Sequence, residues 1–317
     1  MKRFLVVGET NVDVVLRGPA PQAGREVLAD DCALALGGAS AICASGLARL
    51  GNQVMFVSRV GTDLWGDYCL SRLRDAGVDT SYVVRERGVE TGVTVSLSGR
   101  GDRALVTYLG SIDTVTAEDV PDRLFRDADH VHVSSFFLLS RLRPACAHLF
   151  ERARMHGLTT SLDPGWDPCE TWDGQLGAIL DALDVFLPNE AELLAITGAD
   201  SAAAALRRFE RRARVAVKCG SAGAMALDGD SVLQVPAYAA DVIDTTGAGD
   251  SFNAGFLHAF VRQQPIAECL AAGNACGALS TRALGGTTAQ PAIDEMTALA
   301  RAALERPARR SLGEGGR

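Results

Sequence analysis

The stretch from Asp244 to Phe256, DTTGAGDSFNAGF, contains the residues best suited to chemistry. Gly247 and Gly249 allow backbone angles that side chains forbid, which predicts an irregular turn. Phenylalanines then recur four residues apart, which predicts a buried helix. A glycine turn that opens into a helix directs backbone N–H groups and the positive end of the helix dipole at one point, where an anion such as phosphate binds. Asp250 places a carboxylate beside that anion.

The same turn also has a purely structural interpretation. Its glycines could serve only a tight strand–helix connection, and Asp250 could be only a favourable charge at a helix start. Two other phosphate-binding motifs are excluded. Phe252 occupies the position of the third glycine or alanine of a dinucleotide fingerprint. The chain also lacks the sequence Gly-x-x-x-x-Gly-Lys-Ser/Thr, which excludes a P-loop.

Composition limits the class of protein. The 317 residues are 47% apolar, enough for one large α/β domain or two ordinary ones. A net charge of −8 provides no basic surface for nucleic acid. No apolar run approaches the roughly 18 residues of a membrane span, and the run after Met1 is too short for a signal peptide. Eight scattered cysteines without a Cys-x-x-Cys pair predict reduced thiols, so we expect a cytoplasmic protein.

Strands and helices are predicted to alternate along the chain, which is typical of βαβ units and a parallel sheet. Short apolar runs predict strands at 4–7, 54–60, 130–134, 159–163, 185–187 and 215–218. Periodic segments predict helices at 39–50, 64–76, 142–154, 252–260, 267–281 and 293–304. Residues 91–98 and 104–108 flank a turn at 99–102, and their alternation predicts a hairpin with one wet face.

Two segments near the start of the chain could contact a ligand. Residues 9–13, ETNVD, follow the first strand, at the sheet edge where open α/β folds bind ligands. Asp13 could accept hydrogen bonds from a polyol, although an ordinary turn carboxylate explains it better on its own. Gly37 and Gly38 precede a helix of small residues. Close packing of that helix on the sheet explains its alanines well and the glycine pair less well.

Two segments in the second half could contact a nucleotide. Asn189 and Glu192 begin a predicted helix, and a capping box explains both. The glycines of residues 219–223, CGSAG, follow the strand that ends at Lys218 and would let a nucleotide approach the backbone. A β-turn is the simpler explanation of these glycines when they are considered alone.

In combination, these motifs resemble the ribokinase family, also called the PfkB carbohydrate kinases. The thirteen residues 244–256 are similar to its C-terminal signature almost residue for residue, and the other motifs occur in the family's order within about residues 3–300. The resemblance implies an α/β protein with a ribokinase-like three-layer α/β/α sandwich, a mostly parallel central sheet and a small β lid. It implies one domain over 1–305 with the lid at about 14–36 and 86–111. Residues 306–317, rich in Gly and Arg, are expected to form a disordered tail.

The resemblance implies an ATP-dependent sugar kinase that transfers the γ-phosphoryl group to a hydroxyl, as of a hydroxymethyl group, of a sugar or sugar acid. Asp250 would be the base, and the anion hole would use the amides of Gly247, Ala248, Gly249 and Asp250. Mg²⁺ would be reached through water from Glu192, and Asp244 and Thr246 would border a possible K⁺ site. The implied sugar contacts are Asn11, Asp13, Gly37, Gly38 and Ile42. The implied nucleotide contacts are Asn189, Lys218, Gly220, Ser221, Gly223, Gly249 and Asn274.

Departures from the family pattern leave the acceptor open. Ile42 stands where many of the sugar kinases have an asparagine that hydrogen-bonds the sugar, and Gly165 stands after Asp163-Pro164 where relatives often have arginine or asparagine. Ile42 and an apolar lid face favour a nucleoside kinase as the alternative. A non-catalytic sugar-binding regulator is a further alternative, against which the intact Asp250 argues. A dehydrogenase is excluded by the missing fingerprint. The resemblance also implies a homodimer through the lid.

Overall fold

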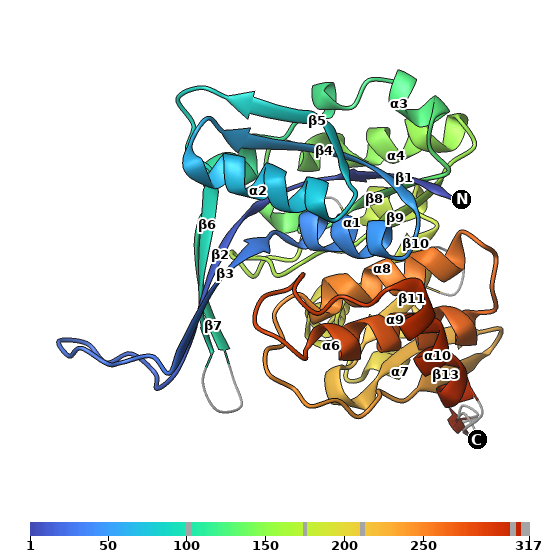
Figure 1. Ribbon diagram of the computed structural model, residues 1–317. Helices are drawn as coiled ribbons and strands as arrows, with labels where there is room; N and C mark the ends of the chain where they lie inside the picture. Colours follow the sequence, from blue (N-terminus) through green and yellow to red (C-terminus); the bar gives the residue numbers. More distant parts are fainter. Residues whose placement is uncertain (99–102, 174–175, 210–212, 305–308, 312–317) are drawn as a thin grey trace.

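The fold is built on one large sheet with helices on both faces. The computed structural model describes residues 1–98, 103–173, 176–209, 213–304 and 309–311. Within these residues the central sheet has the strand order β14-β13-β12-β11-β10-β9-β8-β1-β4-β5. Figure 1 shows helices above and below it, which confirms the three-layer α/β/α prediction. Among the described helices, none has the length and apolar character needed to cross a membrane.

The parallel part of this sheet carries most of the predicted strands. Neighbours from β11 through to β5 pair in parallel. The strands are β1 (Arg3–Val7), β4 (Gln53–Gly61), β5 (Asp79–Glu86), β8 (His130–Val133), β9 (Thr159–Leu162), β10 (Val185–Phe186) and β11 (Arg214–Lys218). Because their carboxyl ends meet at one edge, the polar segments that follow β1, β9 and β11 come together there.

An antiparallel extension follows β11 and was not anticipated from the sequence. It consists of β12 (Ala224–Asp228), β13 (Ser231–Val235) and β14 (Arg309–Ser311). The sequence predicts disorder for 306–317, but Arg309–Ser311 pair with β13; the rest of that segment lies outside the described residues.

Two hydrophobic cores fill the spaces between the sheet and its helices. One core packs against α1 (Ala39–Arg49), α2 (Leu64–Asp75), α8 (Ala248–Phe260), α9 (Ile266–Ser280) and α10 (Ile293–Leu304). The other packs against α3 (Arg123–Arg126), α4 (Cys146–Met155), α5 (Leu176–Asp181), α6 (Glu190–Thr197) and α7 (Ala202–Arg207). Short 3₁₀ turns are η1 (Gly110–Thr114), η2 (Ala117–Asp119), η3 (Phe136–Leu138), η4 (Arg143–Ala145) and η5 (Gly220–Ala222).

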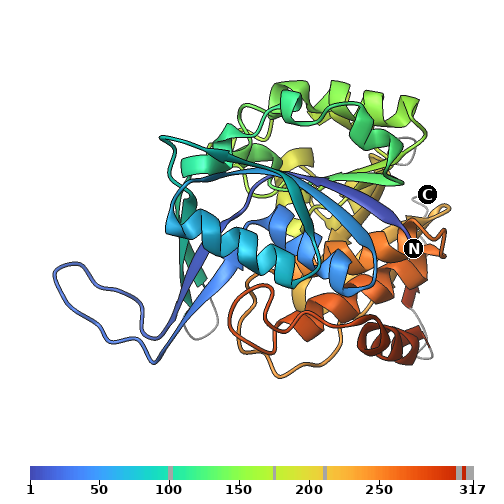
Figure 2. The ribbon, with the colours of Figure 1, turned by 45° about the horizontal axis from the view of Figure 1, so that its top comes forward.

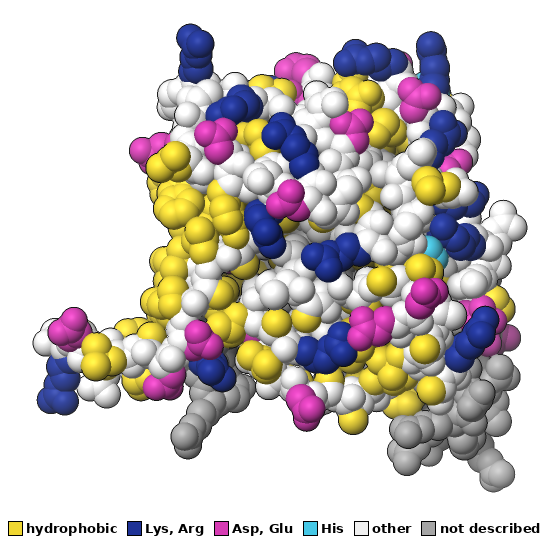
Figure 3. All heavy atoms as spheres, in the orientation of Figure 1, with side chains coloured by type: hydrophobic (Ala, Val, Ile, Leu, Met, Phe, Trp, Pro, Cys, Tyr) yellow, Lys and Arg dark blue, Asp and Glu magenta, His cyan; other side chains and the backbone are white. Residues whose placement is uncertain are grey.

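A second, smaller sheet forms the lid and projects from the body (Figures 1 and 2). Its strands are β3 (Asp31–Gly37), β2 (Asn11–Arg17), β6 (Gly92–Ser98) and β7 (Arg103–Tyr108), in that order. The turn expected at 99–102 lies outside the described residues. Hydrophobic side chains gather along the lid in Figure 3, and Leu105 and Val106 of β7 are exposed. Since β2 begins at Asn11, the polar segment after β1 continues directly into this sheet.

A chain of hydrogen-bonded side chains lies buried between β8 and β9. Thr159 Oγ1 contacts His130 Nδ1, His130 Nε2 contacts Ser161 Oγ, Ser161 Oγ contacts His132 Nδ1, and His132 Nε2 contacts Ser134 Oγ, each at 2.7 Å. Both imidazoles are fully buried. Burial therefore lowers the pKa of His130 well below its usual value and that of His132 to about 4.

These histidines should make the protein less stable in mild acid. Their imidazoles titrate near pH 6.5 when the chain is unfolded but at lower pH when folded, so the unfolded state gains protons first as pH falls. We expect His132 to lower the free energy of unfolding by about 2 kcal/mol between pH 7 and pH 5, and His130 to act in the same direction. Urea unfolding at several pH values measures this slope, and His132→Gln should make it shallower. An equal slope in the variant would contradict the assignment.

Candidate active site

The turn before α8 has the geometry that its glycines predict. Gly247 is the N-cap of α8 and lies in the left-handed region, with φ of 71°. A Cβ at this position would lie 2.6 Å from Gly286 Cα, so no side chain fits. The first helical bond runs from the Ser251 amide to the Gly247 carbonyl at 2.9 Å. The amides that precede Ser251 therefore point out of the end of the helix.

The amides of this turn differ in what they can donate to. The Ala248 amide donates to Thr245 O at 3.2 Å, a contact within the turn itself. Gly249 lies beside Lys218, because a Cβ built on Gly249 would be 3.6 Å from Lys218 Nζ. Asp250 is half-buried in the first turn of α8. The start of α8 thus brings backbone amides and the carboxylate of Asp250 into the neighbourhood of the Lys218 ammonium group.

Lys218 is held in place by a buried ion pair with Asp163. Lys218 Nζ lies 2.5 Å from Asp163 Oδ2, and the side chains of both residues are largely buried. Asn253 Nδ2 donates to the same carboxylate oxygen at 2.5 Å, and the Gly165 amide donates to Asp163 Oδ1 at 3.0 Å. Asn253 is one helical turn after Asp250, so Asp163 links the end of β9, the end of β11 and the start of α8.

Charge interactions decide the protonation states in this cluster. Burial opposes the charged form of both partners, but their attraction keeps the pKa of Asp163 below and that of Lys218 above its usual value. Glu192 lies nearby and responds differently. Burial, helped by the negative charge of Asp163, raises the pKa of Glu192 to about 7. A cation close to Glu192 would reverse this shift.

Asn189 and Glu192 form the capping box that their spacing predicts. Asn189 Oδ1 accepts from the Glu192 amide, and Glu192 Oε2 accepts from the Asn189 amide, both at 2.8 Å. Asn189 also bridges to Lys218 at the end of β11. The capping box therefore holds Glu192 next to the cluster around Lys218. Glu192 can serve both as a helix cap and as a residue of the site.

Asn11, Asp13 and Gly37, three of the sugar contacts expected from the sequence, meet where the lid joins the body. Asn11 Nδ2 donates to Asp13 Oδ1 at 2.8 Å and to Thr94 Oγ1 at 3.1 Å. The hydroxyl groups of Thr94 and Thr107 are hydrogen-bonded to each other, with 3.0 Å between their Oγ1 atoms, and this bond joins β6 to β7. A Cβ at Gly37 would collide with the Asp13 carboxylate, which explains why a glycine is needed there. Together these side chains form a polar patch on the inner part of the lid.

Gly38 and the start of α1 are held by Glu9. Gly38 has φ of 91° and no room for a Cβ, which would lie 2.8 Å from Glu9 O. The Glu9 carboxylate accepts from Ser40 Oγ at 2.7 Å and from the Ser40 amide at 3.4 Å. Glu9 thus supplies the side-chain cap that Gly38 cannot. Burial raises the pKa of this carboxyl group.

Ile42 lies against the turn and not among the polar acceptor residues. Its side chain contacts Gly247 and Gly286, and Cβ atoms built on those glycines would lie 3.1 Å and 2.7 Å from it. Gln290 binds both Ile42 O and Ser251 Oγ. Ile42 therefore packs α1 against the start of α8, which brings the glycine pair and the turn to the same end of two neighbouring helices.

Gly223 and Asn274, two of the residues expected to contact a nucleotide, lie at the end of β13. Gly220 and Ser221 form the exposed turn η5, and Gly223 has φ of 94°. A Cβ at Gly223 would lie 2.6 Å from Ala237 N. Asn274 Nδ2 donates to Val235 O at 2.9 Å and to Pro236 O at 3.2 Å, which makes Asn274 a support for this segment.

Asp244 and Thr246 are engaged within the turn. Asp244 Oδ1 accepts from the amide and hydroxyl of Thr246 at 3.0 and 2.8 Å, and Oδ2 accepts from the Gly285 amide at 2.8 Å. The carboxylate thereby ties the turn to residues 285–286, which pack on Gly247. Across the described ranges, no cluster of three or more His, Cys, Asp or Glu side chains could hold a metal ion by itself.

Comparison with known proteins decides the family. Residues 1–293 match the profile of the pfkB family carbohydrate kinases. The chain belongs to this family. It is therefore a phosphotransferase with an alcohol group as acceptor. This kinase is 34% identical over 311 residues to an ATP-dependent ribose-1-phosphate kinase of Halopiger xanaduensis, covering 94% of this chain and 98% of that protein.

Solved structures agree with the fold of the kinase. The ribokinase of Arabidopsis thaliana in complex with ribose and ATP has a TM-score of 0.78 and 25% identity, covering 95% of this chain and 99% of that chain. A ribokinase-type protein of E. coli in complex with ATP and Mg²⁺ has a TM-score of 0.83 and 24% identity, covering 95% and 99%.

For three residues that the structure brings to this site, the sequence motifs predicted no role in it. Asp163 was noted as the end of a strand but given no role, and Asn253 was interpreted only as part of a helix. Glu9 was included only in a polar cluster. For Asn253, a signal was available, since it follows Asp250 by three residues and shares its helix face. The partners of Asp163 and Glu9 are distant in sequence, so no local pattern indicates them.

Proposed function

We propose that this kinase transfers the γ-phosphoryl group of ATP to a hydroxyl group of a sugar. The observation that carries the proposal is the start of α8, where Lys218 lies beside Gly249 and Asp250 stands in the first helical turn, close enough to interact electrostatically with Lys218. ATP is the named phosphoryl donor of the Halopiger relative and is bound in the two solved structures.

The proposed reaction needs a base for the acceptor hydroxyl and positively charged or N–H groups around the transferred phosphoryl group. Asp250 accepts the proton of the acceptor hydroxyl while that oxygen attacks the γ-phosphorus, and the bond between this phosphorus and the β,γ-bridging oxygen breaks to release ADP. The amides of Gly249 and Asp250 and the Lys218 ammonium stabilise charge on the transferred group. The Ala248 amide already donates to Thr245, so it contributes less than the sequence suggested.

The residues present also fit Mg²⁺. When bound with the nucleotide, Mg²⁺ would neutralise phosphate charge, and it prefers oxygen ligands with retained water. Glu192, whose carboxyl group titrates near pH 7 and is fixed by its capping box, would hold water-mediated contact with it. The nucleotide would extend from Lys218 along the turn of Gly220, Ser221 and Gly223.

The acceptor side favours a sugar over a nucleoside. Asn11, Asp13 and Thr94 present amide, carboxylate and hydroxyl groups, which suit several hydroxyls of a polyol. Ile42 and an apolar lid face favoured a nucleoside. The Ile42 side chain contacts Gly247 and Gly286 and is not part of this polar patch.

A phosphorylation panel tests the proposal and identifies the acceptor. Purified kinase with ATP and Mg²⁺ would be assayed for ADP release with ribose, fructose, 2-keto-3-deoxygluconate, ribose 1-phosphate and adenosine. We expect turnover with a sugar, and Asp13→Asn should raise its KM on the order of tenfold or more, since it weakens a buried charged hydrogen bond. Turnover with adenosine alone would establish the nucleoside kinase. If none of these acceptors gave ATP-dependent turnover, the result would support the non-catalytic sugar-binding regulator.

A further inference from the structure

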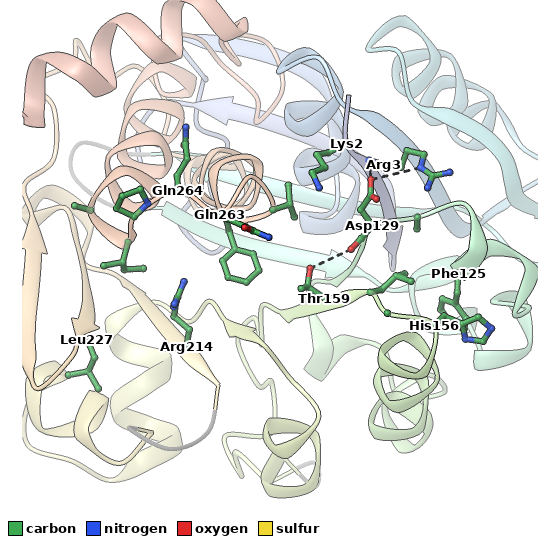
Figure 4. A pocket seen from close by; sticks show the side chains of 18 of the residues that line it. Lys2, Arg3, Phe125, Asp129, His156, Thr159, Arg214, Leu227, Gln263 and Gln264 are labelled. Atoms are coloured by element: carbon green, nitrogen blue, oxygen red, sulfur yellow. Dashed lines mark hydrogen bonds and ion pairs between the residues drawn. The ribbon is translucent and has the colours of Figure 1, made fainter.

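A large cavity opens at the edge of the sheet opposite the catalytic turn. Its volume is about 1060 Å³, the size of a site for a small molecule. It is bordered by the residues that begin β1, β8, β9 and β11 and by the connection from α8 to α9. Since the carboxyl ends of the same strands carry the catalytic cluster, the length of the sheet separates the two sites. Figure 4 shows this cavity from close by.

The cavity is basic although the chain as a whole is acidic. Its lining contains Lys2, Arg3, Arg126 and Arg214 but only two carboxylates, Asp129 and Asp228, in a chain with a net charge of −8. Asp129 Oδ2 accepts from the Arg3 amide at 2.8 Å and lies 3.8 Å from Arg3 Nε, so these two charges offset each other. The remaining cations give the cavity a positive potential that attracts anions.

Two of the cations are available to a ligand. Lys2 and Arg214 have no ion pair with any residue that the structure describes. The Arg214 guanidinium instead lies over the ring of Phe260, 5.7 Å from its centroid, which orients it without neutralising it. Figure 4 draws Lys2, Arg214 and Gln263 on the lining of this one cavity. An ammonium and a planar guanidinium that line the same cavity as an amide suit a phosphate group attached to a polar body.

Gln263 itself is held in an unfavourable backbone conformation. Its φ of 59° is left-handed, at the position after α8 where glycine is the usual residue. The turn is formed by bonds from Gln263 N to Phe260 O and from Gln264 N to Ala259 O, at 2.8 and 3.3 Å. A glycine would form the same turn with less strain. Backbone strain that is kept in a structure clusters at ligand sites.

We propose that this cavity binds a small molecule that carries a phosphate group, with Lys2 and Arg214 on the phosphate and the Gln263 amide on its polar body. The site is separate from the catalytic turn and takes no part in the phosphoryl transfer. A nucleotide and a phosphorylated sugar both carry this chemistry, and the experiment separates them.

The test measures phosphate binding while the catalytic turn is occupied. The full-length kinase, saturated with Mg²⁺ and a non-hydrolysable ATP analogue, would be titrated by calorimetry with inorganic phosphate, ribose 5-phosphate and AMP. Crystals of the same complex would be soaked in tungstate, a phosphate mimic with anomalous scattering. We expect one site per chain and a tungstate peak between Lys2 and Arg214. A preference for AMP or for ribose 5-phosphate identifies the body of the ligand.

Charge-removing variants provide the controls. Lys2→Gln combined with Arg214→Gln should weaken binding on the order of tenfold or more, because two charge-assisted contacts are lost. Arg301→Gln removes an exposed arginine on α10 and should leave binding unchanged. Kinase turnover should be the same in all three proteins, which keeps this test independent of the proposed function. Equal affinity in the double variant, or a saturated enzyme that binds no phosphate, would overturn the proposal.

Gln263 gives a second readout that a merely structural residue would not show. Gln263→Gly should raise Tm by roughly 1–3 °C, because glycine adopts this conformation without strain. The same variant should bind the preferred phosphorylated probe more weakly. Higher stability with unchanged affinity would show that Gln263 does not contact the ligand and would remove it from the site.

Discussion

Asp250→Asn is expected to abolish sugar phosphorylation while nucleotide binding persists. Asparagine keeps the shape of the side chain at the start of α8 but cannot accept the hydroxyl proton. General base catalysis contributes about 10²–10⁴-fold, and the carboxylate also positions the hydroxyl, so kcat should fall by at least about a thousandfold. A coupled assay of ADP release measures kcat, and calorimetry with an ATP analogue measures nucleotide binding.

Asp67→Asn is the matched control for this prediction. Asp67 also lies in the first turn of a helix, α2, and is exposed and paired with Arg85. It carries the same favourable charge at a helix start without a place in the catalytic turn. Its loss should cost at most about 1 kcal/mol of stability and no turnover. If Asp250→Asn behaves like Asp67→Asn and keeps its turnover, Asp250 is only a helix-start charge and the proposed base is wrong.

Breaking the buried pair of Asp163 and Lys218 is expected to damage both stability and turnover. The two charges lie 2.5 Å apart and are largely buried, and removing one partner leaves the other uncompensated. Such a change typically costs about 3–5 kcal/mol. Asp163→Asn should therefore lower the free energy of unfolding by this amount. It should also lower kcat about a hundredfold, as loss of one charge-stabilising group does, because Lys218 loses the carboxylate that holds it beside Gly249.

A double variant separates the two effects. In Asp163→Asn with Lys218→Met neither charge remains, so stability should recover relative to either single variant, whereas turnover should stay low. Urea unfolding and steady-state kinetics on the four proteins of the cycle measure this. Glu295→Gln breaks the exposed pair with Arg282, which spans 2.7 Å, and should change stability by at most about 1 kcal/mol. Full turnover in Lys218→Met would show that its ammonium group serves the fold alone.

The parts of this kinase that were predicted well depend on neighbours in sequence. The helix 293–304 was expected with the bounds that the structure shows, and the capping box of Asn189 and Glu192 follows from a spacing of three residues. The turn at Gly247 follows from the conformations that glycine alone allows. Periodicity, capping and glycine conformation act over a few residues, so a sequence expresses them directly. The antiparallel strands β12 and β13 had no comparably clear alternation and were missed.

The sequence by itself determined the family, the alternating order of strands and helices, and the turn with its carboxylate. Only the tertiary structure decided what surrounds that carboxylate. Asp163 meets Lys218 and Asn253 from 55 and 90 residues away, and Glu9 caps α1 through Ser40, 31 residues after it. The contact of Ile42 with Gly247 and Gly286 likewise joins residues far apart in the sequence. The physical reason is that sheet order and helix packing select these partners, and both are set by burial over the whole chain.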